Sequence, residues 1–223
     1  MSNHQHGSPG GSHSKKPAGS RRASAERAPR SSITTYWVPR WVLDRSWQLL
    51  RQDGLKGVES TVLWGGRRFG AEAIVMAVLY PCGHDVALEP GFVHVGSDTT
   101  AEMGRWLRAQ GLSGLIQVHT HPGAWTGHSP TDDDFSIASS DGFVSLVWPH
   151  YGARQVERID DLGVHRLTGG KWNDLEGSDA EALLRIVESE AAVWAPRLAP
   201  RPAREPITEV AEGPRLSLLG DSE

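Results

Sequence analysis

Apolar residues in the middle of the chain recur with helical spacing in some segments and with strand spacing in others. In the first such segment Leu43, Trp47 and Leu50 follow one another at intervals of four and three residues, which places them on one face of a helix. Two later segments open with a capping-box pattern, in which Thr99 or Ser178 is followed three residues later by a glutamate. We therefore predict helices within residues 40–54, 99–111, 131–140 and 178–194.

Short β-prone runs lie between these helices. Residues 58–66 and 71–80 are separated by a glycine-rich stretch at 65–70, which is typical of a hairpin. A run that begins at Gly114 stops at Pro122, because proline has no N–H to give to a strand ladder. Further strands are predicted at 92–95, 143–148, 154–160 and 163–168. This order predicts a mixed α/β (α+β) domain, with helices packed against one largely antiparallel sheet.

The two ends of the chain differ from the middle in composition. Residues 1–32 contain six Lys and Arg against one glutamate and almost no large apolar residue, so we expect a disordered basic tail. From residue 196 onward Pro and Arg alternate, and we expect 196–223 to be a second disordered tail. One folded domain is predicted at 33–195, as the length of 223 residues suggests.

Composition excludes several classes of protein. Cys82 is the only cysteine, so an intrachain disulfide or a multi-cysteine metal site is impossible. The formal net charge of -4 gives no general attraction to nucleic acid or anionic lipid, and only the basic tail favours such a role. No apolar run reaches the roughly 18 residues of a spanning helix, and the N-terminus lacks the apolar core of a secretory signal. We expect a cytoplasmic protein without a membrane partner.

Candidate chemistry gathers in the stretch QVHTHPGAWTGHSPTDDDF, residues 117–135. His119 and His121 share a face of the predicted strand, because strand side chains alternate. Their Cα atoms would lie about 6.5 Å apart, a base from which two imidazoles can reach one ion. A His-x-His pair alone is nevertheless more often two ordinary strand histidines.

The segment that follows has two interpretations. Ser129 as N-cap, Pro130 at the first helical position and Asp132 two residues later form a good helix start with no chemistry. Thr131 and Asp134 offer the same capping service, however, and would leave Ser129 and Asp132 available for another role.

The pieces fit one kind of metal site when they are taken together. A mononuclear catalytic zinc uses three protein ligands and keeps one position open, and two histidines with one carboxylate form such a set. His119, His121 and Asp132 supply these ligands. Ser129, one helical turn before Asp132, is placed to donate a hydrogen bond to a developing oxyanion.

These residues carry a family resemblance. The fixed positions of the JAMM motif, H-[ST]-H-P-x6-S-x-x-D, are filled by His119, Thr120, His121, Pro122, Ser129 and Asp132. The chain therefore resembles JAB/MPN-domain metalloproteases, above all their compact prokaryotic members, over about residues 34–174. The resemblance implies a JAB/MPN-like (cytidine-deaminase-like) core, one Zn²⁺ per chain, and isopeptidase activity on ubiquitin or ubiquitin-like proteins.

The family pattern also requires a glutamate on an early strand. The candidates are Glu59, Glu72 and Glu89. We favour Glu59, because it lies on the first predicted strand after the first helix. The alternative is a solvent-facing glutamate that pairs with Arg67 or Arg68.

The resemblance implies a mechanism and a substrate. The zinc would lower the pKa of a water, Glu59 would carry a proton from that water to the leaving amine, and Ser129 would stabilise the oxyanion. The bond cut would follow the C-terminal glycine of a ubiquitin-like protein, bound extended beside a sheet edge, in a pathway with activating or conjugating enzymes. Alternatives are hydrolysis of a sulfur-carrier protein or a small amide, and a catalytically silent scaffold, against which the retained ligands argue.

The remaining polar residues near the motif receive plainer interpretations. His128 fills an unfixed motif position and is predicted to be a loop residue, Asp133 a solvated helix position, and Trp125 an exposed or groove-rim tryptophan. Cys82 beside His84 lacks a third group to orient a thiol nucleophile. Ordinary strand or loop positions are predicted for His94, His150 and His165.

Overall fold

The structure is a computed structural model that describes residues 32–134, 136–138 and 140–189. The fold below belongs to the unit that begins at residue 31. Its strands are β1 (Thr35–Pro39), β2 (Thr61–Phe69), β3 (Glu72–Leu79), β4 (Val86–Glu89), β5 (Phe92–Val95), β6 (Ser113–Thr120), β7 (Val144–Trp148), β8 (Gly163–Thr168), β9 (Lys171–Leu175) and β10 (Leu184–Val187). Its helices are α1 (Arg40–Gly54), α2 (Ser97–Ala109), α3 (Pro130–Asp134) and α4 (Gly177–Leu183), with short 3-10 turns η1 (His150–Gly152) and η2 (Ile159–Asp161).

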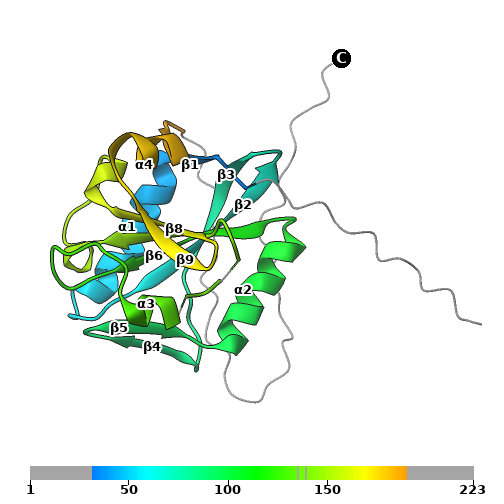
Figure 1. Cartoon of the computed structure of the whole chain (residues 1–223). Coiled ribbons are helices and arrows are strands. Elements are labelled where there is room, and N and C mark those ends of the chain that lie inside the picture. Colours follow the sequence, from blue (N-terminus) through cyan, green and yellow to red (C-terminus); the bar gives the residue numbers. More distant parts are fainter. Residues whose placement is uncertain (1–31, 135, 139, 190–223) are drawn as a thin grey trace, which may run out of the picture. The chain divides into compact units, whose positions relative to one another are not determined.

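Eight strands form one mixed sheet in the order β10-β1-β3-β2-β6-β7-β8-β9, and β4 and β5 form a separate antiparallel pair (Figure 1). The pairs β3–β2, β2–β6, β7–β8 and β8–β9 are antiparallel, whereas β10–β1, β1–β3 and β6–β7 are parallel. The fold is therefore a mixed α/β domain with a mostly antiparallel sheet, as the sequence predicts. Its assignment to the JAB/MPN class stays a prediction.

The two longer helices cover opposite faces of the sheet. Because side chains alternate along β2, Val62 and Trp64 belong to the core cluster that contains the buried face of α1, while Leu63 belongs to the cluster that contains Met103 and Leu107 of α2. This helix–sheet–helix packing buries the central strands β2 and β6 from solvent along most of their length. The polar side chains at the end of β6 are therefore buried at the margin of a rigid core.

The first helix and the hairpin are confirmed, but the turn of the hairpin is not where the glycines suggest. β2 continues through Gly65 and Gly66 to Phe69, with a register irregularity between the two glycines. A side chain at Gly66 would collide with the carbonyl of Ile74 on β3, so this glycine allows close strand approach rather than a turn. The connection to β3 is made at Gly70 and the residue after it.

Both predicted capping boxes are wrong. The helix α2 begins at Ser97, and its first amides are capped from outside by Asp85, whose Oδ2 accepts from the N–H groups of Asp98 and Thr99. The hydroxyl of Thr99 also donates to Asp85 instead of capping the helix. At α4 the N-cap position is occupied by Glu176, with no side-chain cap.

Several segments take a different secondary structure from the predicted one. The expected helix from residue 178 ends at Leu183, and the chain then forms β10, because pairing beside β1 at the sheet edge satisfies its backbone. The expected strand at 154–160 is a loop that leads into η2, and the sequence patterns missed β1, β4 and β9. Apart from Ser32, the predicted tails lie outside the described residues. Within the described residues, no helix is long and apolar enough to cross a membrane.

Candidate metal centre

The ends of two neighbouring elements bring the candidate ligands together. His119 lies on β6, and His121 follows directly after the strand ends. The N–H of Thr120, the last residue of β6, donates to the carbonyl of Ser60, and just beyond the strand the N–H of His121 donates to the carbonyl of Trp148. These bonds hold the backbone of His121 in line with the sheet, so both histidines stay on one face. Asp132 reaches them from α3.

The side chains of these three residues converge. His119 Nε2 lies 3.2 Å from one carboxylate oxygen of Asp132, and His121 Nε2 lies 3.3 Å from the other. One ligand atom from each residue lies within 4.8 Å of the other two. The side chain of His119 is 1% exposed, and its Nε2 is a buried polar atom without a hydrogen-bond partner in the described part of the chain. Such an orphaned ring nitrogen, beside a second imidazole and a carboxylate, fits a metal ion of the zinc type.

The electrostatics of His119 and Asp132 favour their ligand forms, whereas His121 is shifted toward its protonated form while no metal is bound. Burial lowers the pKa of His119 and keeps its imidazole neutral, as metal binding requires. Burial alone would raise the pKa of Asp132, but its contacts with His119 and His121 and the backbone N–H of Ser129 hold it well below the usual range. For His121 the burial penalty is outweighed by Asp132, and the pKa is raised. The cluster without metal thus keeps an ionised carboxylate between two imidazoles.

The outer ring nitrogens of both histidines also meet polar atoms. His121 Nδ1 lies 3.1 Å from the carbonyl oxygen of Trp125, and His119 Nδ1 lies 3.4 Å from Ser145 Oγ. A carbonyl only accepts, so His121 donates from Nδ1 and keeps the lone pair of its neutral ring on Nε2. The indole of Trp125 stacks on the same imidazole, with ring centroids 5.1 Å apart, and remains 59% exposed.

Ser129 and Asp132 form a reciprocal cap at the start of α3. The N–H of Ser129 donates to Asp132 Oδ2 at 2.6 Å, and the N–H of Asp132 donates to Ser129 Oγ at 3.1 Å. The two interpretations of this segment are therefore compatible, since the capping bond itself turns the carboxylate toward the histidines. Among the described residues, the capping bonds at the start of α3 are those of Ser129 and Asp132 and not of Thr131 and Asp134.

Glu59 lies in the segment that leads into β2, at 3% exposure, and its N–H donates to the carbonyl of Glu89 at 2.8 Å. Burial raises the pKa of Glu59 to about 7, with the nearby His121 lowering it and Asp132 raising it. Of the other two candidates, Glu72 accepts from the indole of Trp37, and Glu89 is an exposed residue of β4. Glu59 is thus the candidate that the fold brings beside the histidines and Asp132.

Two further histidines lie closer to this centre than the sequence patterns suggest. The side chain of His128 is almost buried, with its ring centroid 6.0 Å from that of His119 and its Nδ1 2.8 Å from Asp133 Oδ1. His165 of β8 is 2% exposed and lies between the carbonyl of Thr126 and the carboxylate of Asp174. The sequence held one signal for the burial of His165: in a strand at 163–168 it shares a face with Leu167, an apolar residue.

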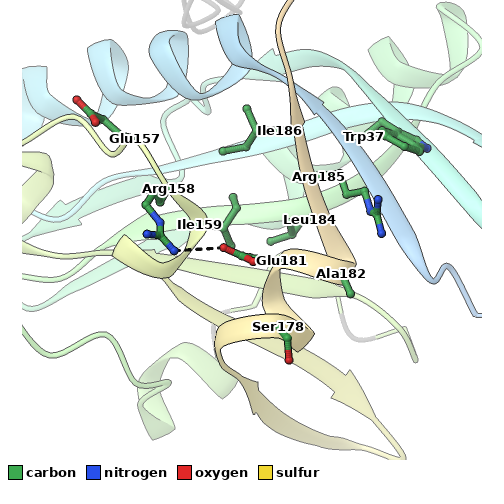
Figure 2. A pocket seen from close by; sticks show the side chains of 10 residues that line it. All are labelled: Trp37, Glu157, Arg158, Ile159, Ser178, Glu181, Ala182, Leu184, Arg185 and Ile186. Atoms are coloured by element: carbon green, nitrogen blue, oxygen red, sulfur yellow. Dashed lines mark hydrogen bonds and ion pairs between the residues drawn. The ribbon is translucent and has the colours of Figure 1, made fainter.

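A hollow of about 620 Å³ lies elsewhere, between η2, α4, β10 and Trp37 (Figure 2). None of the candidate ligands or catalytic residues lines it. Two of its charged groups pair with each other, with 3.3 Å between Arg158 Nη2 and Glu181 Oε1. The chemistry of the chain therefore concentrates at the end of β6 rather than in this hollow.

Known proteins include a relative of similar sequence and a structural neighbour. No family model matches the chain. The chain is 28% identical over 156 residues to a protein of Sinorhizobium fredii (strain NBRC 101917 / NGR234) named "Probable metalloprotease y4jG", over 69% of this chain and 95% of that protein. The solution structure of protein DSY2949 from Desulfitobacterium hafniense superposes with a TM-score of 0.53 at 17% identity, over 70% of this chain and 94% of that one. The latter likeness is one of fold alone.

Proposed function

We propose that this protein is a metal-dependent peptidase whose ion is bound by His119, His121 and Asp132. The observation that carries the proposal is the convergence of two histidine Nε2 atoms on one partly buried carboxylate, with no hydrogen bond between the Nε2 of His119 and any described residue. The similarity to a protein named as a probable metalloprotease supports the same activity.

Zinc is the metal that this set of donors fits best. Two neutral imidazoles and one carboxylate are a common ligand set for catalytic zinc, which keeps a fourth position for water or substrate. When bound, the ion would supply Lewis acidity and lower the pKa of a water molecule.

Glu59 has the properties of a proton carrier at this site. A pKa of about 7 lets its carboxylate take a proton from the attacking water and return it to the leaving amine near neutral pH. The bond from its N–H to the carbonyl of Glu89 holds the backbone of Glu59 in place.

Ser129 is suited to stabilise the oxyanion. Its Oγ already accepts a bond from the N–H of Asp132, and the hydroxyl proton is left to donate to a second acceptor. A fixed donor of this kind favours the tetrahedral transition state over the planar substrate.

For the substrate, the motif and the surface around it support a JAMM-type isopeptidase that cuts after the C-terminal glycine of a ubiquitin-like protein. The large apolar side chains that remain exposed include Trp125, beside the metal ligands, and Phe92, on the β4–β5 hairpin whose Glu89 bonds Glu59. An extended glycine-ended tail could lie along such a surface through backbone hydrogen bonds and apolar contacts.

The first experiment is elemental analysis of the purified chain, with His119→Ala and with His84→Ala as the control at an exposed histidine. We expect about one zinc per chain in the wild type and in the control, and less in His119→Ala. The second is incubation with several ubiquitin-like fusions, which should release the part after the glycine in the wild type but not in Glu59→Gln. Full hydrolysis by metal-free protein would refute the proposal, and a zinc-bound chain inert on all fusions would move it toward small amides or sulfur carriers.

A further inference from the structure

Residues 122–129, in the loop between β6 and α3, connect the histidine ligands to the carboxylate ligand. Its carbonyl at Trp125 is the partner of His121 Nδ1, at 3.1 Å. The orientation of His121 therefore depends on where this loop lies. Within the loop itself no helix or strand fixes the backbone, so the positioning has to come from what the loop contacts.

We propose that His165 is a positioning residue for the metal centre, acting on His121 through this loop. His165 Nε2 lies 2.8 Å from the carbonyl oxygen of Thr126, the residue next to Trp125, and 39 positions away in the sequence. On the other side, His165 Nδ1 lies 2.8 Å from Asp174 Oδ1 on β9. The inference rests on the proposed function, since it presupposes that His121 binds a metal.

The contact is built into the packing of the loop on β8. A side chain at Gly163 would collide with the carbonyl oxygen of Thr126, so only a glycine lets the loop lie this close to the strand. At Gly127 an added Cβ would lie 2.6 Å from the indole of Trp125. The glycine therefore leaves room for this indole to stack on His121. Two glycines thus permit the arrangement that His165 holds.

A second contact holds the same loop near its other end. The imidazole of His128 stacks on the indole of Trp172 of β9, with ring centroids 4.3 Å apart, and its Nδ1 lies 2.8 Å from Asp133. The rings of His128 and His165 are themselves 5.2 Å apart. The β8–β9 hairpin therefore holds the loop at two points, one beside Trp125 and one beside Ser129.

Two substitutions separate the two polar contacts of His165. The side-chain amide of glutamine reaches about as far as Nε2 and can keep the bond to Thr126, while that of asparagine reaches about as far as Nδ1 and can keep only the bond to Asp174. Both remove the buried ring, so both should lower thermal stability. Only the loss of the Thr126 bond should disturb His121.

The measurement is metal affinity by competition with a chromophoric chelator, together with the visible absorption of the Co²⁺-substituted protein. We expect His165→Asn to bind Zn²⁺ about 10-fold more weakly than the wild type, the lower end for outer partners of metal ligands, and to show an altered Co²⁺ spectrum. His165→Gln should stay within about 3-fold and keep the spectrum, as a partial rescue. His84→Gln, at an exposed histidine, should match the wild type in both readouts.

The outcomes separate this inference from the proposed function. A wild-type chain that binds no metal would end the proposed function, and the inference with it. A wild type that binds zinc tightly, with both His165 variants equal to it in affinity and spectrum, would overturn the inference alone. The inference would also be overturned if His165→Gln weakened binding more than His165→Asn, because the bond to Thr126 would then not be the one that matters.

Discussion

Replacement of Glu59 by glutamine should stabilise the metal-free protein at alkaline pH. Glu59 is 3% exposed, and burial raises its pKa from 4.5 to about 7. The folded protein therefore binds this proton more tightly than the unfolded chain does. Stability from this group is fully present below about pH 4.5, falls as the pH rises toward 7, and stays at its lowest above that value. Glutamine is neutral at every pH and avoids this loss.

The size of the effect follows from the same shift. One pKa unit corresponds to about 1.4 kcal/mol, so a rise from 4.5 to about 7 sets an upper limit of roughly 3 kcal/mol. Relaxation and water near the carboxylate reduce this, and we expect Glu59→Gln to gain about 1–3 kcal/mol in the free energy of unfolding at pH 8. At pH 4.5 the gain should be much smaller. A bound metal cation should also reduce it, because a nearby positive charge favours the ionised carboxylate.

The assay is urea denaturation of chelator-treated protein between pH 4.5 and pH 8.5, for the wild type and Glu59→Gln. The matched control is Glu89→Gln, which removes an exposed carboxylate from the neighbouring strand and should leave the difference near zero. A gain that is absent at pH 8, or equally large at pH 4.5, would refute the reasoning, since the benefit of glutamine would then not come from the buried charge.

Three other substitutions test separate parts of the structure. Asp132→Asn should weaken zinc binding more than about 100-fold by chelator competition, since even outer partners of ligands contribute about 10–100-fold; unchanged affinity would remove Asp132 from the ligand set. Gly163→Ala should cost about 1–3 kcal/mol in chemical denaturation, because the new methyl group collides with the carbonyl of Thr126; wild-type stability would mean that the loop shifts freely. Asp53→Asn should cost about 1–3 kcal/mol at pH 7, since the buried carboxylate accepts from Ser60 Oγ and the Tyr80 hydroxyl. Burial would raise the pKa of Asp53, but these bonds and Lys56 lower it overall, so the cost should shrink as the pH falls through that lowered value, and a cost that stays constant in acid would contradict this assignment.

Local periodicity in the sequence was enough to predict several elements and one side of the candidate site. The spacing of Leu43, Trp47 and Leu50 predicted α1, since the amphipathic pattern of a helix can be recognised within a few residues. The alternation of a strand placed His119 and His121 on one face, and Ser129 and Asp132 were close enough in the chain to join them. For these residues the relevant geometry spans a dozen positions, and short-range rules describe it well.

The tertiary structure decided the contacts between distant segments. Pairing with β1 turned residues from Leu184 onward into a strand despite a helical pattern, because a sheet edge offers backbone partners that no local rule can count. The first N–H groups of α2 are capped by Asp85, which lies outside the helix and was not part of the predicted capping box.

The surroundings of the metal centre were decided in the same way. Burial of Glu59, which sets its pKa, depends on β2, β6 and the β4–β5 hairpin assembling around it. The bond from His165 to Thr126 joins residues 39 positions apart. The sequence by itself determined which side chains are candidates to bind a metal, whereas burial and long-range hydrogen bonds, which exist only in the folded chain, decided which groups surround and position them.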